Sequence, residues 1–268
     1  MDFLQALLIA IVEGLTEYLP VSSTAHMIFT SSIFGIQEDD FVKLYQTAIQ
    51  LGAILAVVVL YAKKFFDFTK LNFYIKLAFA VLPALVLGYL FDDYIDAILG
   101  NPIPIAIVLV LGGIVLLFID NYFKNPVVKT EEEITIVKAV KIGFWQCLAM
   151  MPGTSRSAAS IIGGMQQGLS REVAAEFSFF LAVPTMLAVT TYSIVIKKYG
   201  ITETPGYELL LQGNNLTIFL IGSLIAFLVS IVAIKFFIGM IKKYGFKFWG
   251  YYRIVVGIAL LIYFKFIQ

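Results

Sequence analysis

Residues 103–119 read IPIAIVLVLGGIVLLFI, an apolar run without a single charged side chain. A helix needs about 20 such residues, with some latitude, to cross the hydrocarbon core of a bilayer. Further long apolar runs occupy residues 45–62, 73–91, 173–196, 216–241 and 249–267. Together the six runs predict six transmembrane helices.

The composition of the whole chain agrees with this interpretation. Of the 268 residues, 60% are apolar and only 14% are charged, and the mean hydropathy is +0.91. Soluble domains have about 45–50% apolar and about 25% charged residues. A disordered chain and an ordinary soluble enzyme are therefore excluded. The balance of 19 basic against 18 acidic residues implies no nucleic acid or other polyanionic partner.

Two other apolar segments, residues 3–34 and 142–168, are each interrupted by a proline and a polar run. Ser-Ser-Thr follows soon after Pro20, and Gly-Thr-Ser-Arg-Ser follows Pro152. Non-helical backbone at membrane depth is tolerated only where it is buried in protein or lines a cavity. We therefore expect two re-entrant helical hairpins whose tips meet inside the protein.

The two interrupted segments also indicate an internal repeat. Pro152 lies 132 residues after Pro20, and three apolar runs follow each segment. Because three is an odd number, the second copy enters the membrane upside down. The sequence thus predicts an all-α polytopic membrane protein with an inverted-topology repeat. A single membrane domain, 1–268, would hold repeat one at about 1–120, a cytoplasmic linker at about 120–138 and repeat two at about 138–268.

Loop charges predict the orientation. Lys and Arg residues gather in the loops opposite the face from which the first segment enters, and an excess of basic residues marks the cytoplasmic side. Both termini and the loop with Asp92, Asp93 and Asp96 would then lie outside.

Four ionisable side chains fall within the two interrupted segments: Glu13, Glu17, His26 and Arg156. Ionisable groups at membrane depth are costly, so each is a functional candidate. Glu13 and Glu17 are four residues apart and share one helical face. Such a pair suits general acid–base chemistry or a hard divalent cation. Solvated glutamates at a helix end are the alternative, which the apolar flanks disfavour.

The hydroxyl residues Ser22, Ser23 and Thr24 have the layout of a helix N-terminus, which binds phosphate through its free N–H groups. His26 lies three residues after Ser23 and shares its face, so the two outline an activated nucleophile. The alternative is a purely structural role, in which the hydroxyl residues cap the helix and the histidine is buried and hydrogen-bonded.

The second polar run offers a matching set of groups for an anion. Gly153 permits close approach of the backbone to a ligand, and Arg156 carries a planar fork of donors that fits phosphate. The hydroxyls that cap the next helix and contact substrate would come from Thr154, Ser155 and Ser157. A structural salt bridge from Arg156 to Glu17 or Glu13 is the alternative. Taken together, these residues favour a membrane enzyme that acts on a lipid phosphate or diphosphate.

The other ionisable or amide residues in the apolar runs receive a lesser role. We expect packing, snorkelling or supporting functions for Gln50, Glu176, Lys235 and Arg253.

The two polar motifs resemble those of the bacterial undecaprenyl-diphosphate phosphatases of the bacitracin-resistance type. The first reads EGLTEYLPVSSTAH from Glu13 to His26, and the second reads PGTSRSAAS from Pro152 to Ser160. Ala25 stands where glycine is common in that family, and Ser160 where threonine is common. The resemblance covers the whole chain and the order of its spans.

This resemblance implies hydrolysis of undecaprenyl diphosphate to the monophosphate and inorganic phosphate in the bacterial cytoplasmic membrane. It also implies recycling of the carrier lipid of peptidoglycan synthesis, bacitracin resistance on overproduction, and a divalent cation, Mg²⁺ or Ca²⁺, at Glu13 and Glu17. By position, Glu17 and Arg156 would be essential, Ser23 the favoured nucleophile, and Glu13 and His26 its helpers.

Several alternatives stay open at this point. Water or His26 would replace Ser23 as the nucleophile in other schemes. A lipid-phosphate flippase or an ion-coupled transporter would use the same repeat. The expected partners are the lipid substrate and membrane lipids. We expect the active site to be accessible from the extracytoplasmic face. Whether the protein forms a homodimer is left open.

Overall fold

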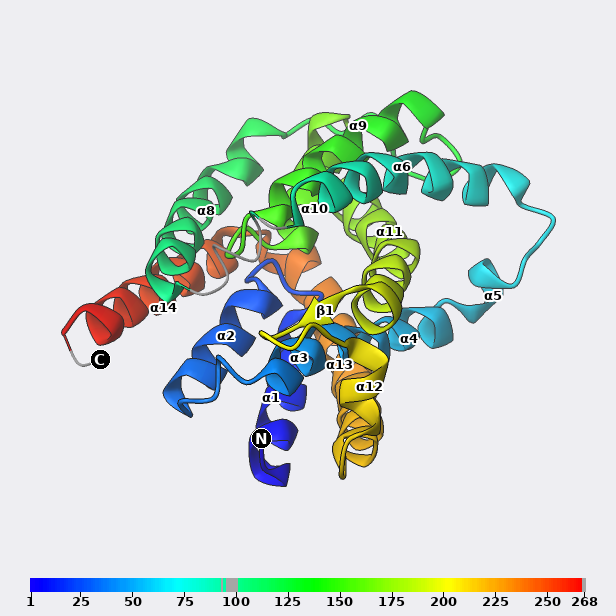
Figure 1. The fold of residues 1–268 in the computed structure, drawn as a ribbon. Coiled ribbons are helices and arrows are strands. Elements are labelled where there is room, and N and C mark those ends of the chain that lie inside the picture. The colour runs from blue at the N-terminus through cyan, green and yellow to red at the C-terminus, as the bar shows by residue number, and fades with distance from the viewer. Residues whose placement is uncertain (93, 95–100, 267–268) are drawn as a thin grey trace.

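The computed structural model describes residues 1–92, 94 and 101–266, and the described chain is almost entirely helical (Figure 1). A short ribbon is the exception, in which β1 (Lys198–Tyr199) pairs antiparallel with β2 (Thr204–Pro205). The predicted loop residues Asp93 and Asp96 lie outside the described residues.

Within the described residues, six helices are long and apolar enough to span a membrane. They are α3–α4 (Asp40–Ala48 and Gln50–Leu60), α6 (Leu71–Leu90), α8 (Pro102–Tyr122), α11 (Arg171–Thr191) with its continuation η2 (Tyr192–Ile196), α13 (Asn215–Tyr244) and α14 (Lys247–Phe266). The six predicted spans are thereby confirmed to within a few residues at each end, except that the predicted end of the last run at residue 267 lies outside the described residues. Large apolar side chains such as Phe118 and Val232 face outward from these helices, as lipid contact requires. The protein is a multi-pass membrane protein.

Each interrupted segment forms two short helices around its proline. The first contains α1 (Phe3–Thr16) and α2 (Ser23–Ile33), and the second contains α9 (Ile136–Gln146), the 3₁₀ turn η1 (Cys147–Met150) and α10 (Arg156–Gln166). In each segment the two helices pack against each other. The remaining short helices are α5 (Ala62–Phe65) and α12 (Gly206–Leu211).

The second helix of each segment begins in the same way. The N-cap residues Ser22 and Ser155 both have a left-handed backbone, with φ of 69° and 75°. Each hydroxyl accepts a hydrogen bond from the amide three residues on, at Ala25 or Ala158. A non-glycine residue in this region is uncommon, and the two segments share this local structure at caps 133 residues apart.

Glycines let the helices approach closely within this one chain. A Cβ on Gly14 of α1 would lie 2.7 Å from the Cβ of Val229 on α13, and one on Gly143 of α9 would overlap the carbonyl oxygen of Ala80 on α6. Likewise α4 and α13 touch at Gly52, and α8 and α14 touch at the Gly112–Gly113 pair. These small residues therefore serve contacts between helices of the same subunit.

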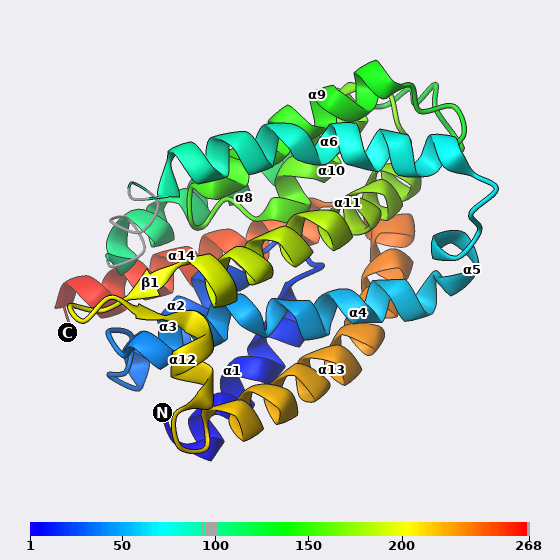
Figure 2. The ribbon, with the colours of Figure 1, turned by 45° about the vertical axis from the view of Figure 1, so that its right-hand side comes forward.

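The ends of the helices separate into two faces. In Figure 2 the N-terminus, the end of α14 and the β ribbon lie at one end of the molecule, while α5 lies at the opposite end. The buried centre between these ends contains the loops that follow α1 and η1.

Candidate active site

A buried cluster joins the two interrupted segments. Arg156, the first residue of α10, donates from Nη2 to Oε1 of Glu17 at 2.7 Å, and Glu17 directly follows α1. Ser23, the first residue of α2, donates from Oγ to Oε2 of the same carboxylate at 2.6 Å. All three side chains are at most 9% exposed. Residues far apart in the sequence thus form one connected hydroxyl–carboxylate–guanidinium site.

The guanidinium of Arg156 is held on two sides. Its Nη1 donates to the carbonyl oxygen of Ser178 on α11 at 2.9 Å, in addition to the Glu17 contact. The Ser178 hydroxyl is 2.6 Å from that of Ser160, which ties α11 to α10. Among the described residues, Nε of Arg156 has no hydrogen-bond partner. One donor of a fixed guanidinium is therefore available to an anion.

His26 does not contact Ser23 in this structure. Its Nδ1 lies 2.8 Å from the carbonyl oxygen of Ser22, and its Nε2 lies 2.9 Å from the hydroxyl of Tyr252, whose ring stacks on the imidazole. A carbonyl oxygen can only accept, so Nδ1 carries a proton and, in the neutral ring, Nε2 accepts from Tyr252. The group placed to receive the Ser23 proton is consequently the Glu17 carboxylate.

Glu13 is fully buried one helical turn before Glu17. Neither of its carboxylate oxygens has a hydrogen-bond partner among the described residues. A buried carboxylate without a partner is costly, and carboxylate oxygens are the ligands that Mg²⁺ and Ca²⁺ prefer. The Glu13 and Glu17 pair therefore fits a divalent cation. The described residues contain no group of three or more His, Cys, Asp and Glu that would hold a metal, so water or substrate oxygens would complete the coordination.

We call residues 19–24 the first tip and residues 152–157 the second tip. The second tip packs tightly between the first tip and α8. Gly153 has φ of +95°, and a Cβ there would lie 2.5 Å from the carbonyl oxygen of Ile105. The Ser155 hydroxyl lies 3.5 Å from the carbonyl oxygen of Leu19 and 3.5 Å from the buried Ser157 hydroxyl. The backbone of this tip is thus fixed by contacts that a larger residue at position 153 would prevent.

The hydroxyl residues predicted to bind substrate differ in how far they are buried. Ser22 and Ser155 are buried and occupied as helix caps, while Thr24 and Thr154 are only half-buried beside the tips.

Sequence reasoning did not single out Tyr252 on α14, and it gave Arg253 only a packing, snorkelling or supporting role. Arg253 is fully buried, which excludes snorkelling and agrees with packing or support. Its guanidinium contacts backbone carbonyls of both tips. A charged residue inside the apolar run 249–267 was the available signal, because such a charge is costly at membrane depth.

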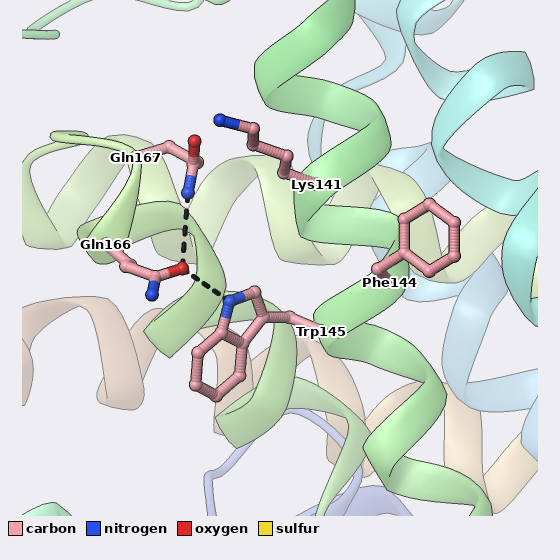
Figure 3. Close-up of a pocket in the computed structure, with 5 residues that line it drawn as sticks. All are labelled: Lys141, Phe144, Trp145, Gln166 and Gln167. Carbon is pink, nitrogen blue, oxygen red and sulfur yellow. Dashed lines mark hydrogen bonds between the residues drawn. The ribbon is translucent and has the colours of Figure 1, made fainter.

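A surface cavity of about 510 Å³ lies away from this cluster, where α9 passes the far end of α10 (Figure 3). Lys141, Phe144 and Trp145 border it together with Gln166, whose side-chain oxygen accepts from Trp145 Nε1 at 2.6 Å. The cavity is lined by none of the residues of the buried cluster.

The fold and site define a multi-pass membrane protein with a buried polar centre suited to phosphate chemistry. The chain belongs to the family of the bacitracin resistance protein BacA, which it matches over residues 6–259. It is 53% identical to the undecaprenyl-diphosphatase of Flavobacterium johnsoniae over 269 residues, which cover 100% of this chain and 98% of that protein. It is also 54% identical to the undecaprenyl-diphosphatase of Flavobacterium psychrophilum over 268 residues, with the same coverage. For the undecaprenyl-diphosphatase of Porphyromonas gingivalis the identity is 48% over 279 residues, with 98% and 96% coverage. The predicted family membership is confirmed.

Proposed function

We propose that this protein hydrolyses undecaprenyl diphosphate to undecaprenyl phosphate and inorganic phosphate. Relatives that carry the name undecaprenyl-diphosphatase match the whole chain at 53% and 54% identity. The observation that carries the proposal is the buried contact of Ser23 and Arg156 with one carboxylate, Glu17. The reaction returns the carrier lipid to the monophosphate form, and bacitracin resistance fits the family name.

Binding of the terminal phosphate would rest on the second tip and on the helix starts. The Nε–H of Arg156, which has no hydrogen-bond partner among the described residues, would donate a charge-assisted hydrogen bond to a phosphate oxygen. The first turns of α2 and α10 add backbone N–H groups and the positive ends of two helix dipoles. The undecaprenyl chain lies among the apolar helices.

Phosphoryl transfer would begin at Ser23. Its Oγ attacks the terminal phosphorus, its proton passes to Oε2 of Glu17, and the bond from phosphorus to the bridging oxygen breaks, which releases undecaprenyl phosphate. Glu17 passes this proton to the departing undecaprenyl phosphate and becomes a carboxylate again. Water then attacks the phosphorus of the phosphoserine and gives a proton to Glu17. That proton goes to Ser23 Oγ as the bond from phosphorus to Oγ breaks, which releases inorganic phosphate and restores the Ser23 hydroxyl. The 2.6 Å hydrogen bond between Ser23 and Glu17 supports Ser23 as nucleophile over His26, whose two ring nitrogens are engaged elsewhere.

A divalent cation, Mg²⁺ or Ca²⁺, would be held by the carboxylates of Glu13 and Glu17, and it supplies positive charge that offsets the charge of the diphosphate. The unpartnered oxygens of Glu13 support this assignment.

The repeat and the re-entrant hairpins belong to the same proposal. The first segment packs through α1 on α13, the second packs through α9 on α6, and α8 packs on α14. This is the pairing expected of two inverted copies with equivalent partners. Repeat one would cover about 1–120 and repeat two about 138–268, joined by the linker at about 120–138.

The site would be reached from the extracytoplasmic side. Lys63 and Lys64 both lie in α5, at the opposite end of the molecule from the N-terminus and the β ribbon (Figure 2). Basic residues mark the cytoplasmic face, so the end with the N-terminus and the β ribbon faces outward.

Phosphate release by the purified protein tests this proposal. The substrate is undecaprenyl or farnesyl diphosphate in detergent, with and without EDTA, and the parent is compared with Ser23→Ala. Ser31→Ala is a matched control, because Ser31 is another buried serine on α2, and its hydroxyl donates within its own helix to the carbonyl oxygen of Ile28. We expect release by the parent and the control, and none by Ser23→Ala.

The same assay separates hydrolysis from transport. A flippase or ion-coupled transporter needs a sealed compartment, whereas hydrolysis does not. A well-folded parent that releases no phosphate in detergent would contradict the hydrolase proposal and favour lipid or ion transport. Strong residual turnover by Ser23→Ala would instead favour direct attack by water.

A further inference from the structure

Within the described residues, Arg253 of α14 is the most deeply buried charge apart from those of the candidate active site. Its side chain is completely inaccessible to solvent. Nη1 donates to the carbonyl oxygens of Pro20 at 3.1 Å and Thr154 at 2.9 Å, and Nη2 donates to that of Gly153 at 2.7 Å. Nε donates to the carbonyl oxygen of Leu109 on α8 at 3.1 Å.

These partners are unusual for a buried arginine. Within the described residues, Arg253 has no carboxylate partner, and backbone oxygens satisfy its donors. A buried charge without a counter-charge is expensive, and an apolar residue of similar volume often gives a more stable protein. Stability of α14 alone therefore does not account for a guanidinium at this position.

The location of the carbonyls indicates what the side chain does. Pro20 lies three residues before Ser23, and Thr154 lies two residues before Arg156. A single rigid guanidinium thus contacts both tips, immediately before the nucleophile of one and the phosphate-binding group of the other. Its planar fork fixes the separation of the tips in a way that a flexible ammonium cannot.

We propose that Arg253 is a positioning residue that holds the two tips in register, so that Ser23 and Arg156 act on the same phosphate. This inference rests on the proposed function. Arg253 itself touches backbone and not substrate. A misplacement of about 1 Å between reacting groups costs about 100-fold in rate. Loosening the tips therefore lowers kcat, although Ser23 and Arg156 themselves are unchanged.

A glycine on the neighbouring helix gives an independent way to disturb this contact. A Cβ on Gly112 of α8 would overlap Nη2 of Arg253. Gly112→Ala therefore displaces the guanidinium without changing any charge. Gly257→Ala is the matched control. Its Cβ would enter the same α8–α14 interface, 2.6 Å from Cγ2 of Val110, and its three nearest neighbours there belong to Val110 and Ala106 and not to Arg253.

The experiment compares Arg253→Met, Arg253→Lys, Gly112→Ala and Gly257→Ala with the parent. It measures kcat and KM for undecaprenyl diphosphate, thermal unfolding, and hydrogen–deuterium exchange of residues 19–24 and 152–157. We expect kcat to fall about 100-fold or more in the first three variants, with a smaller change in KM. Exchange should rise at both tips together in those variants. Gly257→Ala should lose thermal stability yet keep kcat and tip protection near the parent.

Two results would overturn the inference. One is a parent-like kcat with protected tips in Arg253→Met or, if that variant does not fold, in Arg253→Lys or Gly112→Ala. The other is a loss of kcat in Gly257→Ala equal to that in Gly112→Ala, which would assign the effect to helix packing. Failure of the proposed function looks different, because the parent itself would then release no phosphate while the exchange data still report whether Arg253 holds both tips.

Discussion

Replacement of Glu17 by glutamine tests the centre of the site most directly. The carboxylate accepts two hydrogen bonds at once, from Arg156 Nη2 at 2.7 Å and from Ser23 Oγ at 2.6 Å. A glutamine amide has one oxygen and one NH₂ group, so it can accept from only one of them. If the oxygen faces Arg156, the NH₂ group faces Ser23 and no base is left for the serine proton. In the opposite orientation the NH₂ group faces the guanidinium, donor against donor.

The size of the effect follows from the loss of the base. General base catalysis contributes about 10²–10⁴-fold, which corresponds to a barrier increase of about 2.7–5.4 kcal/mol. We therefore expect kcat of Glu17→Gln to fall by at least about 100-fold. The assay is phosphate release under saturating substrate, with thermal unfolding measured beside it to show that the variant is folded.

Glu176→Gln provides the matched control. Glu176 lies outside the site and forms an ion pair with Lys64, with 3.3 Å between Oε2 and Nζ. In the variant, Lys64 keeps its second partner, Glu131, at 3.1 Å. This variant should retain the activity of the parent. A Glu17→Gln protein that turns over substrate within a few-fold of the parent rate would refute the assignment of Glu17 as base.

Three further variants probe the cation, the guanidinium and the helix packing. Glu13→Gln should raise the Mg²⁺ or Ca²⁺ concentration needed for half-maximal activity, and an unchanged cation requirement would contradict the assignment of Glu13 as a ligand. Arg156→Lys should lose most activity in the same phosphate-release assay, because an ammonium does not reproduce the planar fork, and parent-like turnover would refute this. Gly52→Ala should destabilise the fold by about 1–3 kcal/mol in thermal unfolding, because its Cβ would overlap the carbonyl oxygen of Ser223, whereas Gly239→Ala, with open space around it, should not.

The helical architecture could be predicted because it follows from local composition. Each span is an apolar run of nearly the right length, and each break contains a proline followed by cap residues. The contact between Glu17 and Arg156 also appeared beforehand, as the salt bridge offered for a buried arginine. An unsatisfied backbone group is costly in the membrane, and so is an unpaired buried charge. These free-energy costs leave few possible structures in both cases.

Other partners of the site could not be predicted, because they depend on which helix packs beside the tips. The spacing of His26 from Ser23 suggested a shared face, yet the imidazole stacks on Tyr252, which is 226 residues away. The partners of Arg253 are backbone carbonyls, which every residue possesses and which therefore leave no mark in the sequence. Both contacts depend on where α14 lies against α8, α2 and the two tips.

The charges in the buried centre agree with the proposal that a divalent cation and an anionic substrate bind there together. Glu17 is neutralised by Arg156, and Arg253 is solvated by carbonyl dipoles. The carboxylate oxygens of Glu13, in contrast, have no hydrogen-bond partner among the described residues. An anionic phosphate alone would repel Glu13, and a cation alone would leave the free donor of Arg156 unused. A diphosphate that arrives with a divalent cation satisfies both groups at once. We therefore expect substrate and cation to bind cooperatively, and Glu13→Gln should weaken this coupling, measured as the cation dependence of KM.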